Sequence, residues 1–281
     1  MITKGCLKVS VLGCGWAGLP AAAALVKNGY TVKGSTTHLT NMSSLALNGV
    51  LPYRVIASLA LEGERVTEFF NTDVLIVTLP PPRMQGLPDY HLKVHREIAA
   101  QAIRSNIQRV ILYSSTSVYP ESQGRVVEED ATVTPSAHSG VSLLEIERCY
   151  TTQTQLDVVV LRFGGLVGPM RHPGKFLRER NLIVSSEAPV NMVHLDDVVG
   201  ATVFAIEKPL LAGAYNVVAP EEASRGEFYK AALIAMGQPE PACDGLQGHF
   251  KRVSSARIQS AGYTFKQADL LRWLKTPDQR R

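Results

Sequence analysis

A glycine-rich loop is the first group of residues whose types and spacing could do chemistry. Residues 13–18 read Gly-Cys-Gly-Trp-Ala-Gly and lie between an apolar run and an alanine-rich segment typical of a helix. In a GxGxxG loop the first glycine permits a tight turn, the second lets the backbone approach a pyrophosphate, and the third allows close helix packing. Such a loop can also be a turn that only packs. We predict that it binds a dinucleotide through Gly13, Gly15, Trp16, Ala17 and Gly18.

The segment that follows bears on which dinucleotide is bound. Sites for NAD usually carry an acidic residue about 20 positions after the first glycine, where it binds the ribose 2′-hydroxyl. Here residues 33–38 read Lys-Gly-Ser-Thr-Thr-His, and no carboxylate occurs before Glu62. An acidic residue would repel a 2′-phosphate, so its absence, with the hydroxyls of Ser35 and Thr36, favours NADP, and NAD is the alternative cofactor. No arginine follows this segment, and Lys33 could point to the opposite face of its strand.

A cluster of hydroxyl side chains closes a later apolar run. Residues 113–120 read Tyr-Ser-Ser-Thr-Ser-Val-Tyr-Pro. A hydroxyl at the end of a strand can cap the backbone, or it can hydrogen-bond to a reacting oxygen. Ser115 is the candidate for the second role, and both interpretations stay open.

Alternating strand and helix segments must position these residues. The apolar pattern predicts strands at 7–12, 30–34, 74–79, 109–113 and 156–162, and helices at 17–27, 90–105 and 141–152. Such alternation is typical of βαβ units and of a parallel sheet covered by helices on both faces. We therefore predict an α/β fold: a Rossmann-type, doubly wound parallel sheet with a small C-terminal substrate domain. The expected domains are 1–165 and 166–281, with segments near 195–219 packing back on the first.

Composition narrows the classes of partner. The chain has 281 residues, 45% of them hydrophobic and 19% charged, with a formal net charge of +4, which is typical of a globular protein. No apolar run is long enough for a membrane span, and no element combines basic and aromatic residues as a nucleic-acid binder would. Four cysteines without a CxxC pair indicate a reduced, cytoplasmic protein. His91 and His95 have a spacing that can bind a metal, but without a third ligand we expect surface histidines and no metal site.

Later motifs carry a resemblance to a known family. They are Leu-Arg-Phe-Gly-Gly-Leu-Val-Gly-Pro at 161–169, Val-His-Leu-Asp-Asp-Val at 193–198 and Tyr-Asn-Val at 215–217, in order after the glycine loop and the hydroxyl cluster. Together they resemble the extended short-chain dehydrogenase/reductase superfamily, also called the NAD-dependent epimerase/dehydratase family, and look most like its bacterial YeeZ-like branch. The resemblance implies that Ser115 orients a reacting oxygen. It also implies that the ribose and nicotinamide are flanked by Thr78, Leu79, Pro80 and Leu166.

The chain departs from that family at its proton donor. The family uses the tyrosine of a YxxxK motif, whose lysine lowers the tyrosine pKa. Here Ser139 stands at the tyrosine position and Leu143 at the lysine position, and none of the nine tyrosines has a lysine four residues later. His194 could donate a proton near neutral pH, cap the following helix or bind substrate. Arg171, in a loop rich in glycine and proline, suits an anionic substrate or a solvated surface.

Two functions follow as expectations. The first is an NAD(P)-binding oxidoreductase or epimerase-like protein of the extended short-chain dehydrogenase type, acting on a small polar substrate bound by Arg171 and His194. The second is a non-catalytic dinucleotide-binding sensor, which the missing tyrosine and lysine favour. Many relatives pair through a helical bundle, so a homodimer is expected by analogy alone.

Overall fold

The chain divides into two compact units, which are described separately. The structure is a computed structural model, and it describes residues 7–80, 88–121, 124–132, 142–177, 182–208 and 212–276. Unit 1 comprises Met1–Val118, Thr132–Arg162 and Ala201–Ala214, and unit 2 comprises Tyr119–Ala131, Phe163–Gly200 and Tyr215–Arg281. Residues 119–131, which the sequence analysis placed in the first domain, belong to unit 2 because β7 (Gly124–Val126) pairs with β14 (Lys251–Val253).

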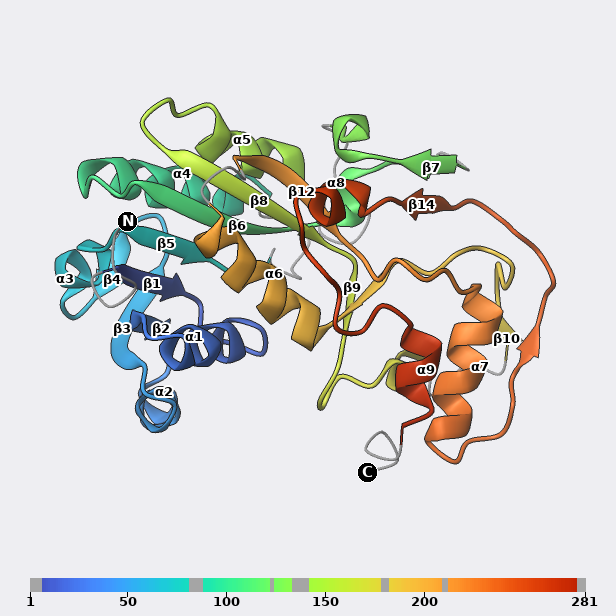
Figure 1. Cartoon of the computed structure of the whole chain (residues 1–281). Helices are drawn as coiled ribbons and strands as arrows, with labels where there is room; N and C mark the ends of the chain where they lie inside the picture. Colours follow the sequence, from blue (N-terminus) through green and yellow to red (C-terminus); the bar gives the residue numbers. More distant parts are fainter. Residues whose placement is uncertain are drawn as a thin grey trace. The chain divides into compact units, whose positions relative to one another are not determined.

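A mostly parallel sheet forms the centre of unit 1 (Figure 1). Its strand order is β12-β8-β6-β5-β1-β2-β3-β4. The strands are β1 (Lys8–Leu12), β2 (Thr31–Thr36), β3 (Leu51–Ala57), β4 (Leu61–Gly63), β5 (Val74–Val77), β6 (Arg109–Ser115), β8 (Asp157–Phe163) and β12 (Gly213–Val217). The chain runs outward from β1 through β2 and β3, then restarts at β5 on the other side of β1. Ligands of such sheets bind where the strand order reverses, at the carboxyl ends of the strands, and the glycine loop follows β1 at this point.

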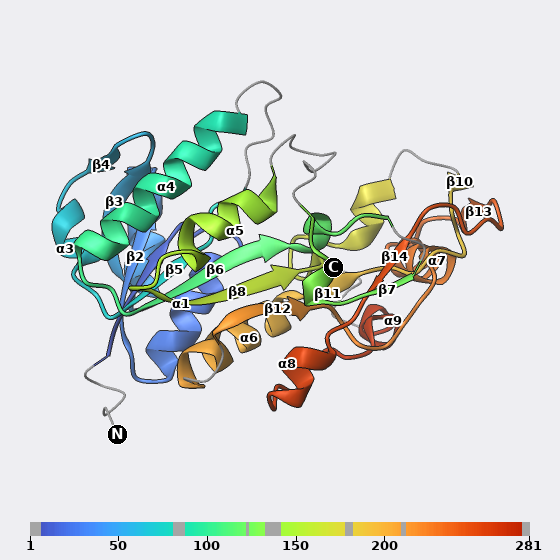
Figure 2. The same cartoon turned by 90° about the horizontal axis from the view of Figure 1, so that it is seen from above.

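Helices cover both faces of this sheet. In Figure 2, α4 (Pro88–Arg104) and α5 (Leu143–Thr151) lie along one face, while α1 (Gly18–Lys27) and α6 (Leu195–Glu207) lie along the other. The short helices α2 (Met42–Leu47) and α3 (Val66–Phe70) flank the β2–β3 side. All four residues of β5 are buried, as expected for a strand covered on both faces. The α/β, Rossmann-type fold predicted from the sequence is therefore confirmed.

Helix ends follow local capping rules. The Ser142 side chain accepts a hydrogen bond from the Glu145 amide, so α5 begins at Leu143. The Ser224 side chain and Glu227 form a reciprocal capping box at the start of α7 (Arg225–Ala235).

β3 and β4 lie outside the strands expected from the sequence, because Pro52 and Arg54 interrupt the apolar run of β3.

Unit 2 is built from short strands and helices. Its strand pairs are β7 with β14, β9 (Gly165–Val167) with β11 (Met192–His194), and β10 (Leu182–Ile183) with β13 (Ala242–Cys243). Its remaining helices are α8 (Ala256–Ser260) and α9 (Leu270–Leu274). Phe228 and Tyr229 of α7 form a buried core with Leu270 and Trp273 of α9. Among the helices that the structure describes, none has both the length and the apolar character needed to cross a membrane.

Candidate functional site

The three glycines of the loop differ in how much space there is for a Cβ atom at each position. Gly13 has φ +105°, and a Cβ there would lie 2.7 Å from the Thr78 hydroxyl oxygen. A Cβ on Gly18 would lie 2.2 Å from the Gly13 carbonyl oxygen, so Gly18 is required for helix α1 to pack on the loop. A Cβ on Gly15 would meet no described atom within 4 Å. The folded chain therefore does not itself require glycine at residue 15, and the open side of Gly15 leaves room for a ligand.

Hydrogen bonds from neighbouring strands hold the loop in place. The Gly13 amide donates to Ser35 Oγ at 2.8 Å, and the Cys14 amide donates to the Ser35 carbonyl at 2.9 Å. The Thr78 hydroxyl donates to the Gly13 carbonyl at 2.5 Å. Ser35 is only 1% exposed. Ser35 and Thr78 thus support the loop backbone, and their hydroxyls are engaged there.

The loop leads into a helix end that suits an anion. Helix α1 begins at Gly18, its N-cap Ala17 provides no capping side chain, and its first turn holds no acidic residue. The Leu19 amide donates to the Gly15 carbonyl at 3.0 Å, and Pro20 has no amide hydrogen. The helix dipole is positive at this end, which favours a phosphate group. Cys14 adds no nucleophile, because burial raises the pKa of its thiol to about 12.

The Lys33 amine is hydrogen-bonded to helix α3. Its Nζ donates to the carbonyl oxygens of Glu68 at 2.5 Å and Asn71 at 2.7 Å, at the end of α3. The side chain is 8% exposed, and burial lowers the pKa of the amine. Thr36 closes β2, and its Oγ1 accepts a hydrogen bond from the His38 amide at 3.2 Å. The side chains of Lys33 and Thr36 are therefore both engaged within the fold.

Ser115 closes β6 in a capping geometry. Its Oγ accepts a hydrogen bond from the Ser117 amide at 3.2 Å and lies 3.2 Å from Ser117 Oγ, while the side chain is half-buried. The neighbouring Ser114 hydroxyl donates to the Glu147 carboxylate at 2.6 Å, and Arg162 forms a salt bridge with the same carboxylate. The capping interpretation of Ser115 thus has a geometric basis, and a role toward a substrate remains a proposal.

The position of the family's lysine is apolar. Leu143 is the first residue of α5 and is 7% exposed, so it offers no cation to a neighbouring acid. Ser139 lies outside the described residues. The Tyr113 hydroxyl lies 2.6 Å from Thr202 Oγ1, and burial raises its pKa well above the usual value. Tyr113 is therefore a poor proton donor near neutral pH.

In each of two histidines of unit 2, one ring nitrogen is hydrogen-bonded and the other has no hydrogen-bond partner among the described residues. His194 Nδ1 accepts from the Asp196 amide at 3.1 Å, which caps α6, and it lies 3.3 Å from the Asp196 carboxylate. His172 Nδ1 accepts from the Gly174 amide at 3.2 Å. The Nε2 atom of each ring is buried without a partner in the part of the chain that the structure describes. Both rings pack near Trp273, with centroids 4.8 Å from it for His194 and 6.2 Å for His172.

Other predicted residues of unit 2 lie in the strand and loop before these histidines. Leu166 belongs to β9 and pairs with Val193 of β11. Arg171 is half-buried after the exposed Met170. Of the predicted cofactor residues, Leu79 and Pro80 follow β5 in unit 1, half-buried and exposed respectively.

The expectation of surface histidines at residues 91 and 95 is wrong. His91 is 7% exposed and His95 is 1% exposed. His95 Nδ1 lies 2.8 Å from the Tyr150 hydroxyl, and its Nε2 lies 3.2 Å from His91 Nε2. The two rings form a buried hydrogen-bonded chain between α4 and α5, which helical spacing could not reveal. No group of three or more potential metal ligands occurs among the described residues.

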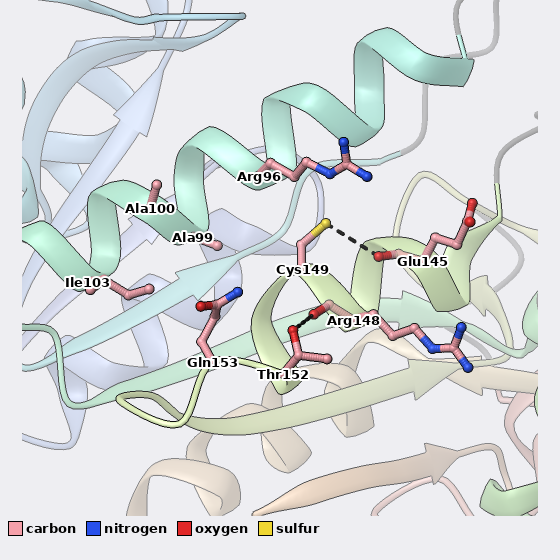
Figure 3. Close-up of a pocket in the computed structure, with 9 residues that line it drawn as sticks. All are labelled: Arg96, Ala99, Ala100, Ile103, Glu145, Arg148, Cys149, Thr152 and Gln153. Carbon is pink, nitrogen blue, oxygen red and sulfur yellow. Dashed lines mark hydrogen bonds between the residues drawn. The ribbon is translucent and has the colours of Figure 1, made fainter.

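A cavity of about 430 Å³ lies between α4 and α5 (Figure 3). Its lining comprises Arg96, Ala99, Ala100, Ile103, Glu145, Arg148, Cys149, Thr152 and Gln153. Cys149 Sγ donates to the Glu145 carbonyl at 3.3 Å, and burial raises the pKa of the thiol. Because none of the residues predicted from the sequence to form a site lines it, we assign this cavity no role in the chemistry.

Comparisons with known proteins agree with the geometry of the loop and the sheet. Residues 11–218 match the model of the NAD dependent epimerase/dehydratase family. Protein YeeZ of Escherichia coli K12 is 32% identical over 269 residues, which cover 94% of this chain and 97% of that protein. The chain therefore belongs to the NAD dependent epimerase/dehydratase family.

Solved structures share the fold at low sequence identity. UDP-glucuronic acid 4-epimerase from Bacillus cereus, in complex with NAD, has a TM-score of 0.78 at 20% identity and covers 96% of each chain. The human epimerase family protein SDR39U1 with NADPH has a TM-score of 0.71 at 16% identity, covering 96% of this chain and 98% of that chain. At sequence identities this low, the comparison establishes only that the fold is shared.

Proposed function

We propose that this protein binds NADP(H) and acts as an oxidoreductase or epimerase-like enzyme on a small polar substrate. The observation that carries the proposal is the open side of Gly15, where a Cβ would meet no described atom within 4 Å. A glycine that the fold does not need is explained by a pyrophosphate that approaches the backbone. Gly13 and Gly18 shape the turn around it, and the backbone of Trp16 and Ala17 leads into the uncapped helix end.

The other cofactor residues have distinct roles in this proposal. Ser35 and Thr78 hold the loop through its backbone, and Thr36 lies beside the adenosine ribose. Leu79, Pro80 and Leu166 flank the ribose and nicotinamide, as the family resemblance implies. When bound, the cofactor supplies or accepts a hydride at its nicotinamide ring. NAD is the alternative cofactor.

The candidate substrate residues are those that the sequence and the family resemblance indicated. Ser115 orients the reacting oxygen, while Arg171 and His194 bind a polar or anionic group of the substrate. Support comes from the buried His194 Nε2, which has no partner among the described residues. A buried polar atom without a hydrogen bond costs about 1–3 kcal/mol, which a substrate acceptor or donor would recover. The expected homodimer remains a prediction.

A second candidate function is a non-catalytic dinucleotide sensor. Leu143, buried at the position of the family's lysine, favours it because the described residues supply no cation there to a proton donor. Turnover distinguishes the two functions. An enzyme would oxidise NADPH with a carbonyl or imine substrate and lose this activity in Ser115→Ala, whereas a sensor would bind cofactor and turn over none of the compounds screened.

Gly15→Ala tests the binding proposal. We expect the variant to keep its melting temperature, since the added Cβ meets no described atom. We expect it to weaken NADPH binding at least about tenfold by crowding the pyrophosphate. The measurement is a fluorescence titration of cofactor-stripped protein, with Trp16 in the loop as a reporter. Wild-type protein that binds neither NADPH nor NADH, or Gly15→Ala that binds as wild type does, would overturn the proposal.

Gly18→Ala provides the matched comparison for this test. Its Cβ would lie 2.2 Å from the Gly13 carbonyl oxygen, so the fold itself must shift. We expect a lower melting temperature in this variant, with a loss of about 1–3 kcal/mol in stability. Together, the two variants distinguish a glycine that packing requires, Gly18, from one that the proposed ligand requires, Gly15.

A further inference from the structure

Arg54 is a basic residue opposite the end of β2, and its guanidinium Nε has no hydrogen-bond partner among the described residues. It lies on β3 and pairs with Thr36, the last residue of β2, in the parallel ladder. Its Nε is buried without a hydrogen-bond partner, and its guanidinium forms no ion pair within the described ranges. An arginine placed in this way retains a permanent positive charge and a planar fork of donors.

The sheet register places Arg54 on a different face from Lys33. Residues two apart on a strand share a face, and side chains paired across a ladder point the same way. Lys33, Ser35 and Tyr53 share one face, where Lys33 Nζ lies 6.0 Å from the Tyr53 ring centroid and bonds the end of α3. Arg54 shares the other face with Thr36 and Gly34, where an added Cβ on Gly34 would touch Cys14 of the loop and Leu45 of α2.

The face shared by Gly34, Thr36 and Arg54 borders the phosphate-binding loop. A Cβ added to Gly34 would lie 2.7 Å from Cys14 Sγ, so the loop lies against this face of β2. Neighbouring strands lie roughly 5 Å apart, so Arg54 is one strand further out from the loop along the same sheet edge. In this fold a dinucleotide places its pyrophosphate at the loop and its adenosine ribose at the end of β2. A 2′-phosphate on that ribose would face the region of Thr36 and Arg54.

The local charge is also suited to an anion. The first acidic residue of the chain is Glu62. It is exposed on β4, and its carboxylate accepts a hydrogen bond from the Ser58 hydroxyl. Arg54 therefore has no acidic partner among the described residues to neutralise it, and a guanidinium forms strong paired hydrogen bonds with phosphate oxygens.

We propose that Arg54 binds the 2′-phosphate of the cofactor and thereby sets a preference for NADP(H) over NAD(H). The inference rests on the proposed dinucleotide site and adds the residue that selects the cofactor. It accounts for a site in which Lys33 is committed to α3 and no arginine follows β2. The cofactor's phosphate would supply the partner that the Arg54 guanidinium lacks.

Isothermal titration of NADP⁺ and NAD⁺ into wild type and Arg54→Gln tests this proposal. We expect wild type to prefer NADP⁺, and Arg54→Gln to lose about 10- to 100-fold in NADP⁺ affinity, the value of one charged phosphate contact. NAD⁺ affinity should stay within about twofold of wild type, because NAD⁺ lacks the phosphate. Arg54→Lys keeps the charge without the paired geometry and should lie between the two.

Arg65→Gln is the control for charge alone. Arg65 is on the same unit, is exposed, and already pairs with Glu68, so its replacement should leave the ratio of NADP⁺ to NAD⁺ affinity unchanged. Equal weakening of both cofactors in Arg54→Gln, or no weakening of either, would overturn the proposal. A wild type that binds both dinucleotides without preferring NADP⁺ would overturn it while leaving the loop proposal intact. Binding of neither dinucleotide by wild type would instead overturn the proposed function itself.

Discussion

Glu147 and Arg162 form a buried ion pair that joins α5 to β8. Their side chains are 3% and 4% exposed, and Arg162 bonds both carboxylate oxygens, at 3.0 and 2.6 Å. The Ser114 hydroxyl donates to the same carboxylate at 2.6 Å. The pair therefore fixes the end of β6, where Ser115 follows, relative to the helix that begins at Leu143.

Loss of one member of this pair should destabilise unit 1 strongly. Glu147→Ala removes the carboxylate and leaves the buried guanidinium without it, which typically costs about 3–5 kcal/mol. The free energy of unfolding from urea titration measures the effect. Arg104→Ala, which removes the exposed pair with Glu97, should cost less than about 1 kcal/mol. A Glu147→Ala variant as stable as Arg104→Ala would show that the ion pair does not hold the strand end.

Lys33 should contribute to stability and not to cofactor choice. Lys33→Met removes the donor to two carbonyl oxygens at the end of α3, and we expect a loss of about 1–3 kcal/mol in unfolding free energy. The ratio of NADP⁺ to NAD⁺ affinity should not change. Lys93→Met, at an exposed position of α4, is the stability control and should change the free energy by less than about 0.5 kcal/mol. A Lys33→Met variant with wild-type stability and altered cofactor preference would contradict this assignment.

The buried histidine chain should make stability depend on pH. Burial, with a smaller contribution from His91, lowers the pKa of His95 to about 3, whereas an unfolded imidazole titrates near 6.5. Between these values the unfolded chain binds a proton that the folded chain does not. His95 therefore leaves stability unaffected above about pH 6.5, and stability falls as the pH drops toward 3, by up to about 1.4 kcal/mol per pH unit.

His95→Gln tests this dependence through a slope. Urea unfolding at pH 7.5, 6 and 5 should show a smaller loss of stability on acidification in the variant than in wild type, whatever its stability at pH 7.5. His249→Gln, at an exposed position, should keep the wild-type slope. An unchanged slope in His95→Gln would mean that this imidazole takes up its proton in the folded state.

Local sequence was sufficient to predict the fold and the glycine loop. The alternation of apolar strands with helical segments depends on neighbours within a few residues, and it predicted the strands β1, β2, β5, β6 and β8 within a few residues of their observed ends. GxGxxG depends on backbone conformation, which each glycine encodes by itself. Gly13 shows this directly, since its φ of +105° is a conformation that residues with a side chain rarely adopt.

Only the tertiary structure decided which side chains are hydrogen-bonded within the fold and which have no partner among the described residues. Lys33 lies close to the expected ribose in sequence, yet the register of β2 turns it toward α3, while Arg54, 21 residues later, reaches the ladder position of Thr36. His91 and His95 resembled surface residues until the packing of α5 placed Tyr150 against them. These outcomes depend on partners that lie far away in the sequence and on the face that each strand presents. Short-range patterns carry neither kind of information, because pairing and packing form only when the whole sheet assembles.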